Sequence, residues 1–164
     1  MSFGEEGGSE VGYETIHGRN WPSITQYSVF LENRVGQLLE VLRAFHGSKV
    51  KIVSLTISDS ADCSILRLIL SHPEQGREII SLHKLAFAEN ELLVAELPTG
   101  PGSLVDLCSS LLQAEVNIYY AYPLIVHPHG RAAIALHVDN NELAGATLHA
   151  MGFEILSEAD LKTY

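Results

Sequence analysis

The stretch "FLENRVGQLLEVLRAF", residues 30–45, decides the fold because a strand-like run changes there into a helix-like one. Residues 27–31 have the aromatic and β-branched character of a strand. After Gly36, apolar residues recur at helical spacing, at Leu38, Leu39, Val41, Leu42 and Phe45. The segment Arg34–Gly36 is therefore predicted to open a helix, and Gly36 lies at the junction.

The same pattern returns later in the chain. "NRVGQLLEVL", from Asn33, matches "TGPGSLVDLC", from Thr99, with Gly36 against Gly102, an offset of 102 − 36 = 66 residues. Near the end of each unit, "LHKLAF" at 82–87 matches "LHAMGF" at 148–153 with the same offset, 148 − 82 = 66. Agreement at two distant places indicates an internal duplication.

Each unit is predicted to have the order β-α-β-β-α-β. In the first unit, strands over 53–57 and 63–71 form a hairpin, Pro73 opens a second helix, and 91–97 is the last strand. In the second, we expect a helix over 104–114, strands over 116–126 and 134–138, a helix over 141–151 and a short strand over 153–156. The strand at 91–97 must close the first unit and open the second.

This order is that of the ferredoxin-like fold, so we expect an α+β protein of two such units that share or abut a central strand. Residues 1–22 are rich in Gly and Glu without periodicity and are predicted to be a disordered tail. The first domain is expected over 23–90 and the second over 91–164.

Composition excludes several classes of function. The net charge is −10 and Lys and Arg form no cluster, which argues against binding to nucleic acid or to an anionic membrane. No segment has the length of a membrane span, and the start of the chain lacks the features of a signal peptide. The two cysteines, Cys63 and Cys108, lie among apolar residues and are expected to be small core side chains. A cytoplasmic protein is predicted.

The loop motifs resemble those of the ACT domain, a small regulatory module that binds amino acids in metabolic enzymes. The resemblance rests on a strand followed by Asn or Asp, two residues, Gly, any residue and Leu, inside a ferredoxin-like unit. "ENRVGQL", residues 32–38, fits this pattern, and "PTGPGSL", residues 98–104, fits it with Thr99 in place of the acidic or amide residue. Val35 also departs from the family, where proline is frequent. The resemblance covers about residues 24–161.

The resemblance implies an amino-acid site at each loop. A helix amino terminus offers unpaired N–H groups and partial positive charge to a carboxylate, and a glycine there removes a Cβ that would hold the ligand away. An equally good interpretation is that Gly36 and Gly102 only permit a tight turn and Asn33 only caps the helix. The candidate ligand-binding residues are Asn33, Arg34, Val35, Gly36, Gln37 and Leu38; Thr99, Gly100, Pro101 and Gly102; and Asn117, Ile118 and Tyr119.

The first loop is expected to be the better site. Asn33 offers both a carbonyl and an amide, whereas Thr99 offers one hydroxyl and Pro101 lacks an N–H. The segments 99–103 and 117–120 are expected to form the wall against which the ligand of the first site closes.

Other chemistry is less well supported. "HPHG" at 127–130, with His137, lacks the ligand spacing of a metal site, and no metal or cofactor is predicted. "YYAYP" at 119–123 suits either a strand or an aromatic pocket wall. Arg34 resembles the loop arginine of acylphosphatases, but their glycine-rich phosphate cradle is missing. No catalytic constellation is apparent, so the chain is not expected to be an enzyme.

The sequence therefore predicts a stand-alone regulatory protein that binds an amino acid and associates as a homodimer. The alternative is a regulatory subunit of a partner enzyme, because residues 31–38 resemble the opening of the small subunit of acetolactate synthase. Because the apolar strand face of Ile134, Leu136 and Val138 needs cover, we expect a pseudo-symmetric pair of units within the chain as well as the homodimer.

Overall fold

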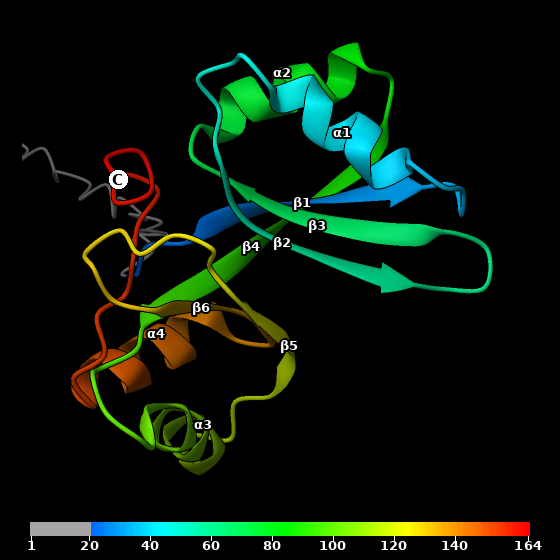
Figure 1. Ribbon diagram of the computed structural model, residues 1–164. Coiled ribbons are helices and arrows are strands. Elements are labelled where there is room, and N and C mark those ends of the chain that lie inside the picture. The colour runs from blue at the N-terminus through cyan, green and yellow to red at the C-terminus, as the bar shows by residue number, and fades with distance from the viewer. Residues whose placement is uncertain (1–20) are drawn as a thin grey trace, which may run out of the picture.

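The computed structural model describes residues 21–164 (Figure 1). In chain order the elements are β1 (Ile24–Leu31), α1 (Gln37–Phe45), β2 (Ile52–Asp59), β3 (Ser64–Leu70), α2 (Pro73–Leu82), β4 (Ala86–Glu96), α3 (Ser103–Gln113), β5 (Ile118–Pro123), β6 (Ala133–Val138) and α4 (Asn141–Ala150). The predicted α+β class with two ferredoxin-like units is confirmed. The predicted tail lies outside the described residues, apart from Trp21 and Pro22.

The first unit is an antiparallel sheet in the order β2-β3-β1-β4, with α1 and α2 on one face (Figure 1). Alternate residues of β1 point toward the helices, as the pleat of a strand requires. Tyr27, Val29 and Leu31 are at most 2% exposed on this side. They pack with Val41, Phe45, Val50, Leu66, Leu68, Leu70 and Ile80. The helices of this unit thus bury one face of their own sheet.

Strand β4 belongs to both units. Its residues 86–92 pair with β1, and its residues 93–96 pair with β6. All five residues from Leu92 to Glu96 are buried, because the strand is covered on both faces where the units meet. The prediction of one long shared strand is confirmed, and the expected domain boundary after residue 90 falls inside it.

The second unit has the order β5-β6-β4, with α3 and α4 on its outer face. The strand expected at 153–156 is reduced to one bridge between Ala95 and Ile155, flanked by hydrogen bonds from Glu96 N to Glu154 O and from Leu156 N to Val94 O. The apolar face of β6, which the sequence predicts to need cover, is covered within the chain by the helices of its own unit. Leu136 and Val138 are at most 6% exposed, and they pack with Ile134 against α3 and α4.

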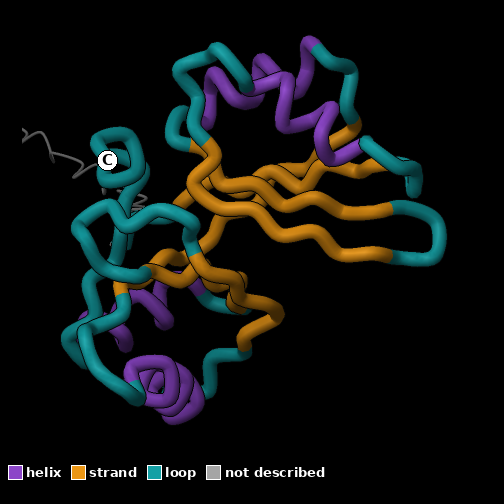
Figure 2. Tube along the Cα trace, viewed as in Figure 1, coloured by secondary structure: helices purple, strands orange, loops and turns teal. Residues whose placement is uncertain are grey.

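The two units bring the open faces of their sheets together, which gives four layers with helices outermost (Figure 2). A third core fills the contact. It consists of Ile24, Val53, Ile69, Leu92, Val94, Tyr122, Leu124, Ala133, Ala135, Leu156 and Leu161. Hydrogen bonds between β2 and the end of β5 also join the units, among them one from Ile125 N to Val53 O at 2.9 Å and one from Ser54 Oγ to Pro123 O at 2.5 Å.

The cysteines differ from expectation. Cys63 is half-buried in the β2–β3 turn, and Cys108 is exposed on α3, so neither is a core side chain. Both are free thiols.

Among the described residues, no helix has the length and apolar character needed to cross a bilayer.

Candidate ligand-binding site

The first predicted loop connects β1 to α1 and is exposed throughout. Gly36 has φ 87° at the amino terminus of α1, and no side chain caps the helix. The side chain of Asn33 is tied to the β2–β3 turn instead. Its amide donates to Ser60 O at 3.4 Å, and its carbonyl accepts a hydrogen bond from the Ser64 hydroxyl. Both polar groups of Asn33 are therefore occupied within the first unit.

The charged side chains of this loop are also paired. The guanidinium of Arg34 donates two hydrogen bonds to the Glu40 carboxylate, at 2.7 and 3.2 Å, and lies 3.6 Å from Glu32. The pair raises the pKa of Arg34 and lowers that of Glu40. Val35 is fully exposed, and Leu38 packs against the core of the first unit. Gln37 borders a small pocket of about 110 Å³ that Asn33 does not line.

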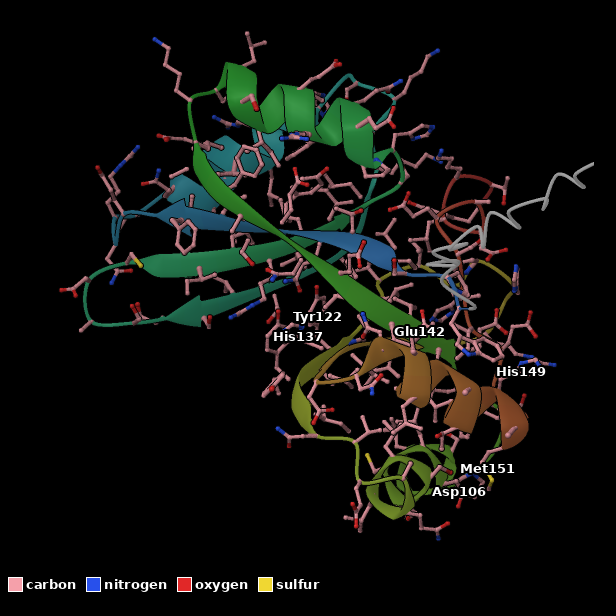
Figure 3. The ribbon with its side chains drawn as sticks, turned by 180° about the vertical axis from the view of Figure 1, so that it is seen from behind. Asp106, Tyr122, His137, Glu142, His149 and Met151 are labelled. Atoms are coloured by element: carbon pink, nitrogen blue, oxygen red, sulfur yellow. The ribbon has the colours of Figure 1, made fainter. Side chains whose placement is uncertain are left out.

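The second loop, by contrast, opens into a pocket of about 380 Å³. The loop contributes Pro98, Thr99, Gly100 and Pro101, and α3 contributes Ser103, Asp106, Ser109, Ser110 and Gln113. Met151 and Phe153, which follow α4, complete the wall. Figure 3 shows Asp106 and Met151 beside each other at the end of the second unit. The volume lies within the range of roughly 300–1,000 Å³ that is usual for small-molecule sites.

Polar groups of both signs line this pocket. Gly102 has φ 104°, and the first hydrogen bond of α3 runs from Asp106 N to Gly102 O, so the helix does not use the N–H groups of residues 103–105. These groups and the helix dipole favour an anion. Asp106 supplies a negative charge about one turn along the helix. Ser110, which also lines the pocket, is nearly buried, and its hydroxyl donates to Asp106 O at 2.7 Å.

The repeat explains why the two loops differ. Under the 66-residue offset, Asp106 corresponds to Glu40, and Gly100 corresponds to Arg34. Arg34 neutralises Glu40, but Gly100 has no side chain to do the same for Asp106. Within residues 21–164, the Asp106 carboxylate forms no ion pair. The second unit thus keeps a free carboxylate at the position where the first unit has a neutralised one.

The third predicted segment, at the start of β5, lies at the other end of α3 from Thr99–Gly102, about 16 Å away by the rise of the 11-residue helix. Asn117 N donates to Asp139 Oδ1 at 3.1 Å, Ile118 packs against the core of the second unit, and Tyr119 is 59% exposed. The loop that joins β1 to α1 lies at the end of the first unit that points away from the second unit (Figure 1). A single chain therefore does not bring the three predicted segments together.

Sequence reasoning missed the polar face of α3. Ser103, Asp106, Ser110 and Gln113 recur at helical spacing inside a correctly predicted helix, so their common face could have been recognised. The positions of Met151 and Phe153 in the pocket wall could not have been predicted, because they depend on how the end of α4 packs against α3.

Two of the histidines considered for a metal site, His129 and His137, contact neighbouring side chains. His129 Nδ1 lies 2.5 Å from the buried Glu96 carboxylate, and its Nε2 lies 3.3 Å from Asp160. His137 stacks on Tyr120, with 4.8 Å between ring centroids. Burial and the neighbouring Arg67 lower the pKa of His137. Of the aromatic run, Tyr120 and Tyr122 lie in the contact between the units.

The chain belongs to the ACT family: a family model described as an ACT domain pair matches residues 22–164. It is similar to a protein from Bacteroides thetaiotaomicron with 25% identity and a TM-score of 0.77, over 87% of this chain and 97% of that one. It also resembles the ligand-free regulatory subunit of aspartate kinase from Thermus thermophilus, with 10% identity and a TM-score of 0.57, over 81% of this chain and 93% of that one. Among curated proteins, no sequence relative matches.

Proposed function

We propose that this ACT pair is a regulatory protein that binds a free amino acid in the pocket of the second unit. The carboxylate of the ligand accepts hydrogen bonds from the first-turn N–H groups of α3, and its ammonium group faces Asp106. A zwitterion matches this arrangement because each of its charges is opposite in sign to the end of the site that it faces. The apolar side chains of Met151 and Phe153 contact the side chain of the bound amino acid.

The unpaired carboxylate of Asp106 is the observation that carries this proposal. A site that binds an ammonium group needs a carboxylate that no protein cation has already neutralised. The second unit meets this requirement and the first does not, because Arg34 holds Glu40. This geometry favours the second loop, the reverse of the ranking that Asn33 and Thr99 suggested.

Calorimetric titration of the full chain with each of the common amino acids tests the proposal. We expect one site per chain for at least one of them. Asp106→Asn keeps the shape and removes the charge, and it should weaken binding by about ten- to a hundredfold, since a hydrogen bond to a charged group contributes roughly 1.5–3 kcal/mol. Glu40→Gln, at the equivalent position of the first unit, is the matched control and should leave affinity unchanged. Absence of binding to every amino acid, or equal losses in the two variants, would contradict the proposal.

The proposal extends to a partner enzyme that the bound amino acid controls. No catalytic domain is evident within residues 21–164, which the two ACT units fill. A regulatory subunit resembling that of acetolactate synthase is one form this partnership would take. Affinity purification of the tagged chain from its own cells, with and without the amino acid identified by calorimetry, tests this part. Recovery of no enzyme under either condition would favour a sensor that acts without one.

A further inference from the structure

Trp21, the only tryptophan of the chain, lies just before β1 of the first unit but packs against α4 of the second. Its side chain is partly buried, and its ring centroid lies 4.8 Å from that of His149, with the two planes tilted by 45°. A tryptophan buries a large apolar area wherever it packs. Trp21 thus joins the start of the first unit to the last helix of the second.

Gly145 makes room for the indole. It is buried in the middle of α4, where glycine is the least favourable residue apart from proline. A Cβ at this position would lie 2.6 Å from Trp21 Cγ, 2.9 Å from Trp21 Cβ and 3.1 Å from Trp21 Cδ1. These atoms form the base of the side chain, so a methyl group on Gly145 would displace the whole indole. We call the surface formed by Gly145 and His149 the α4 notch.

The first unit has a large side chain at the equivalent position. Under the 66-residue offset, Gly145 corresponds to Ile79 and His149 corresponds to His83. Ile79 packs against the core of its own unit, and His83 Nδ1 lies 2.9 Å from Ile79 O. The fold of a unit therefore does not require a glycine at this place in its second helix. In α4 the glycine accommodates Trp21.

The end of α4 connects the notch to the ligand pocket. Gly152 N donates to His149 O and Phe153 N donates to Leu148 O, both at 3.0 Å. Met151 and Phe153, which this last turn holds, form the pocket wall opposite α3. Figure 3 shows His149 and Met151 together at this end of the helix. A displacement of the last turn of α4 therefore moves the pocket wall.

We propose that Trp21 is a positioning residue for the ligand pocket. Seated on the α4 notch, it fixes the last turn of α4 and, through that turn, the wall of Met151 and Phe153. That this wall contacts an amino acid rests on the proposed function, whereas the coupling of Trp21 to the wall does not. Coupling between two sites is reciprocal, so a ligand in the pocket changes the surroundings of the indole. Occupancy of the pocket is thereby linked to the segment that leads into β1.

Two natural probes report on the two ends of this connection. Trp21 is the only indole, and Met151 is the only methionine besides Met1. In the full chain with isotope-labelled methionine methyl groups, Gly145→Ala should shift the NMR signal of Met151 and move the Trp21 emission to longer wavelength. Trp21→Ala should shift the same methyl signal, and Trp21→Phe, which keeps an aromatic ring, should restore much of it. Phe30→Ala is the matched control, because Phe30 is 42% exposed at the other end of β1, and it should leave the signal unchanged.

A double-mutant cycle tests the notch itself. With Trp21 present, Gly145→Ala should lower the midpoint of thermal unfolding, because the methyl group displaces the indole. In the Trp21→Ala background the same substitution should raise the midpoint, because only the higher helix propensity of alanine remains. A midpoint that Gly145→Ala raises in both backgrounds, or a Met151 signal that neither Gly145→Ala nor Trp21→Ala changes, would overturn the coupling.

Calorimetry with the amino acid that binds the wild type tests the link to the ligand. Trp21→Ala should weaken its affinity by about five- to tenfold, the lower end of usual couplings between separate sites, and Trp21→Phe should weaken it less. Equal affinity of the wild type and Trp21→Ala would overturn the positioning role and leave the proposed function intact. A wild type that binds no amino acid, with a Met151 signal that still responds to Trp21→Ala, would contradict the proposed function and support the coupling.

Discussion

Gly36 and Gly102 adopt the same backbone conformation at the amino termini of equivalent helices. Their dihedral angles are φ 87°, ψ −7° and φ 104°, ψ −9°, and they stand 66 residues apart. A positive φ favours glycine because a Cβ is strained there. At both positions, a methyl group in place of the glycine hydrogen would meet nothing within 4 Å. The backbone conformation of the turn is therefore a sufficient reason for both glycines. Binding measurements distinguish this role from a role in ligand approach.

Gly36→Ala and Gly102→Ala should each lower the free energy of unfolding by about 1–2 kcal/mol, the cost of a left-handed conformation for an L-residue. Asparagine tolerates this conformation, so Gly36→Asn and Gly102→Asn should cost less. Denaturant unfolding measures these differences. If a glycine serves only the turn, its alanine variant leaves amino-acid affinity unchanged. A loss of affinity in Gly102→Ala without a similar loss in Gly36→Ala would identify the second loop as the binding loop.

Asn33→Ala should loosen the β2–β3 turn. The asparagine side chain bridges Ser60 and Ser64, and its removal leaves those groups to water. Because the site is exposed, the loss should be about 1 kcal/mol or less. Hydrogen exchange should show faster exchange for the amides of residues 59–64, with α3 unaffected. Ser60→Ala is a control, since Asn33 bonds only to the backbone carbonyl of that residue. If instead Asn33→Ala abolishes amino-acid binding and leaves the turn unchanged, the first loop is the ligand site after all.

The fold was accessible from the sequence because its determinants are local or repeated. The 66-residue offset, the glycine at each helix start and the alternation in β2 and β6 each identify an element without knowledge of its neighbours. The shared strand followed from counting, since the second unit has no other candidate for its first strand. The pocket could not be predicted in this way, because it depends on the lack of a side chain at Gly100 and on the place where α4 ends. The exposure of Cys108 similarly depends on which face of α3 meets the sheet, and the apolar residues around it gave a misleading signal.

Gln26 shows another limit of sequence reasoning, because it is fully buried between the units. Its amide donates to Tyr120 Oη at 2.8 Å, and its carbonyl accepts from Tyr122 Oη at 2.6 Å. Burial raises the pKa of Tyr122, so this hydroxyl stays protonated and remains a donor at all ordinary pH values. Nothing in the alternation of β1 distinguishes this glutamine from a solvent-facing one.

Gln26→Leu should therefore destabilise the contact between the units. It leaves the Tyr122 hydroxyl buried without a partner, which costs about 1–3 kcal/mol. Adding Tyr122→Phe removes that hydroxyl, so the double variant should be more stable than Gln26→Leu alone. Equilibrium unfolding of the two single variants and the double variant measures this coupling. Additive losses would show that the two side chains do not depend on one another.

The last prediction concerns pH and the carboxylate of Asp160. Burial raises the pKa of Asp160, but hydrogen bonds from Ser157 N at 2.7 Å and Ser157 Oγ at 2.8 Å, together with His129, outweigh burial and hold it below its ordinary value of 3.8. The folded state thus binds the proton less tightly than the unfolded state. The stabilisation is complete above the unfolded pKa and is lost as the pH falls through the folded one. Asp160→Asn should accordingly lower the free energy of unfolding at pH 7, and this difference from the wild type should shrink progressively below about pH 4.

His129→Ala should also destabilise the protein at pH 7, because it leaves the buried Glu96 carboxylate without the imidazole 2.5 Å away. His127→Ala, two residues earlier in the same turn, is the control for this substitution. Thermal unfolding across the pH range measures all three variants, and a difference between Asp160→Asn and the wild type that persists unchanged at pH 3 would show that the shape of the side chain, not its charge, stabilises this turn.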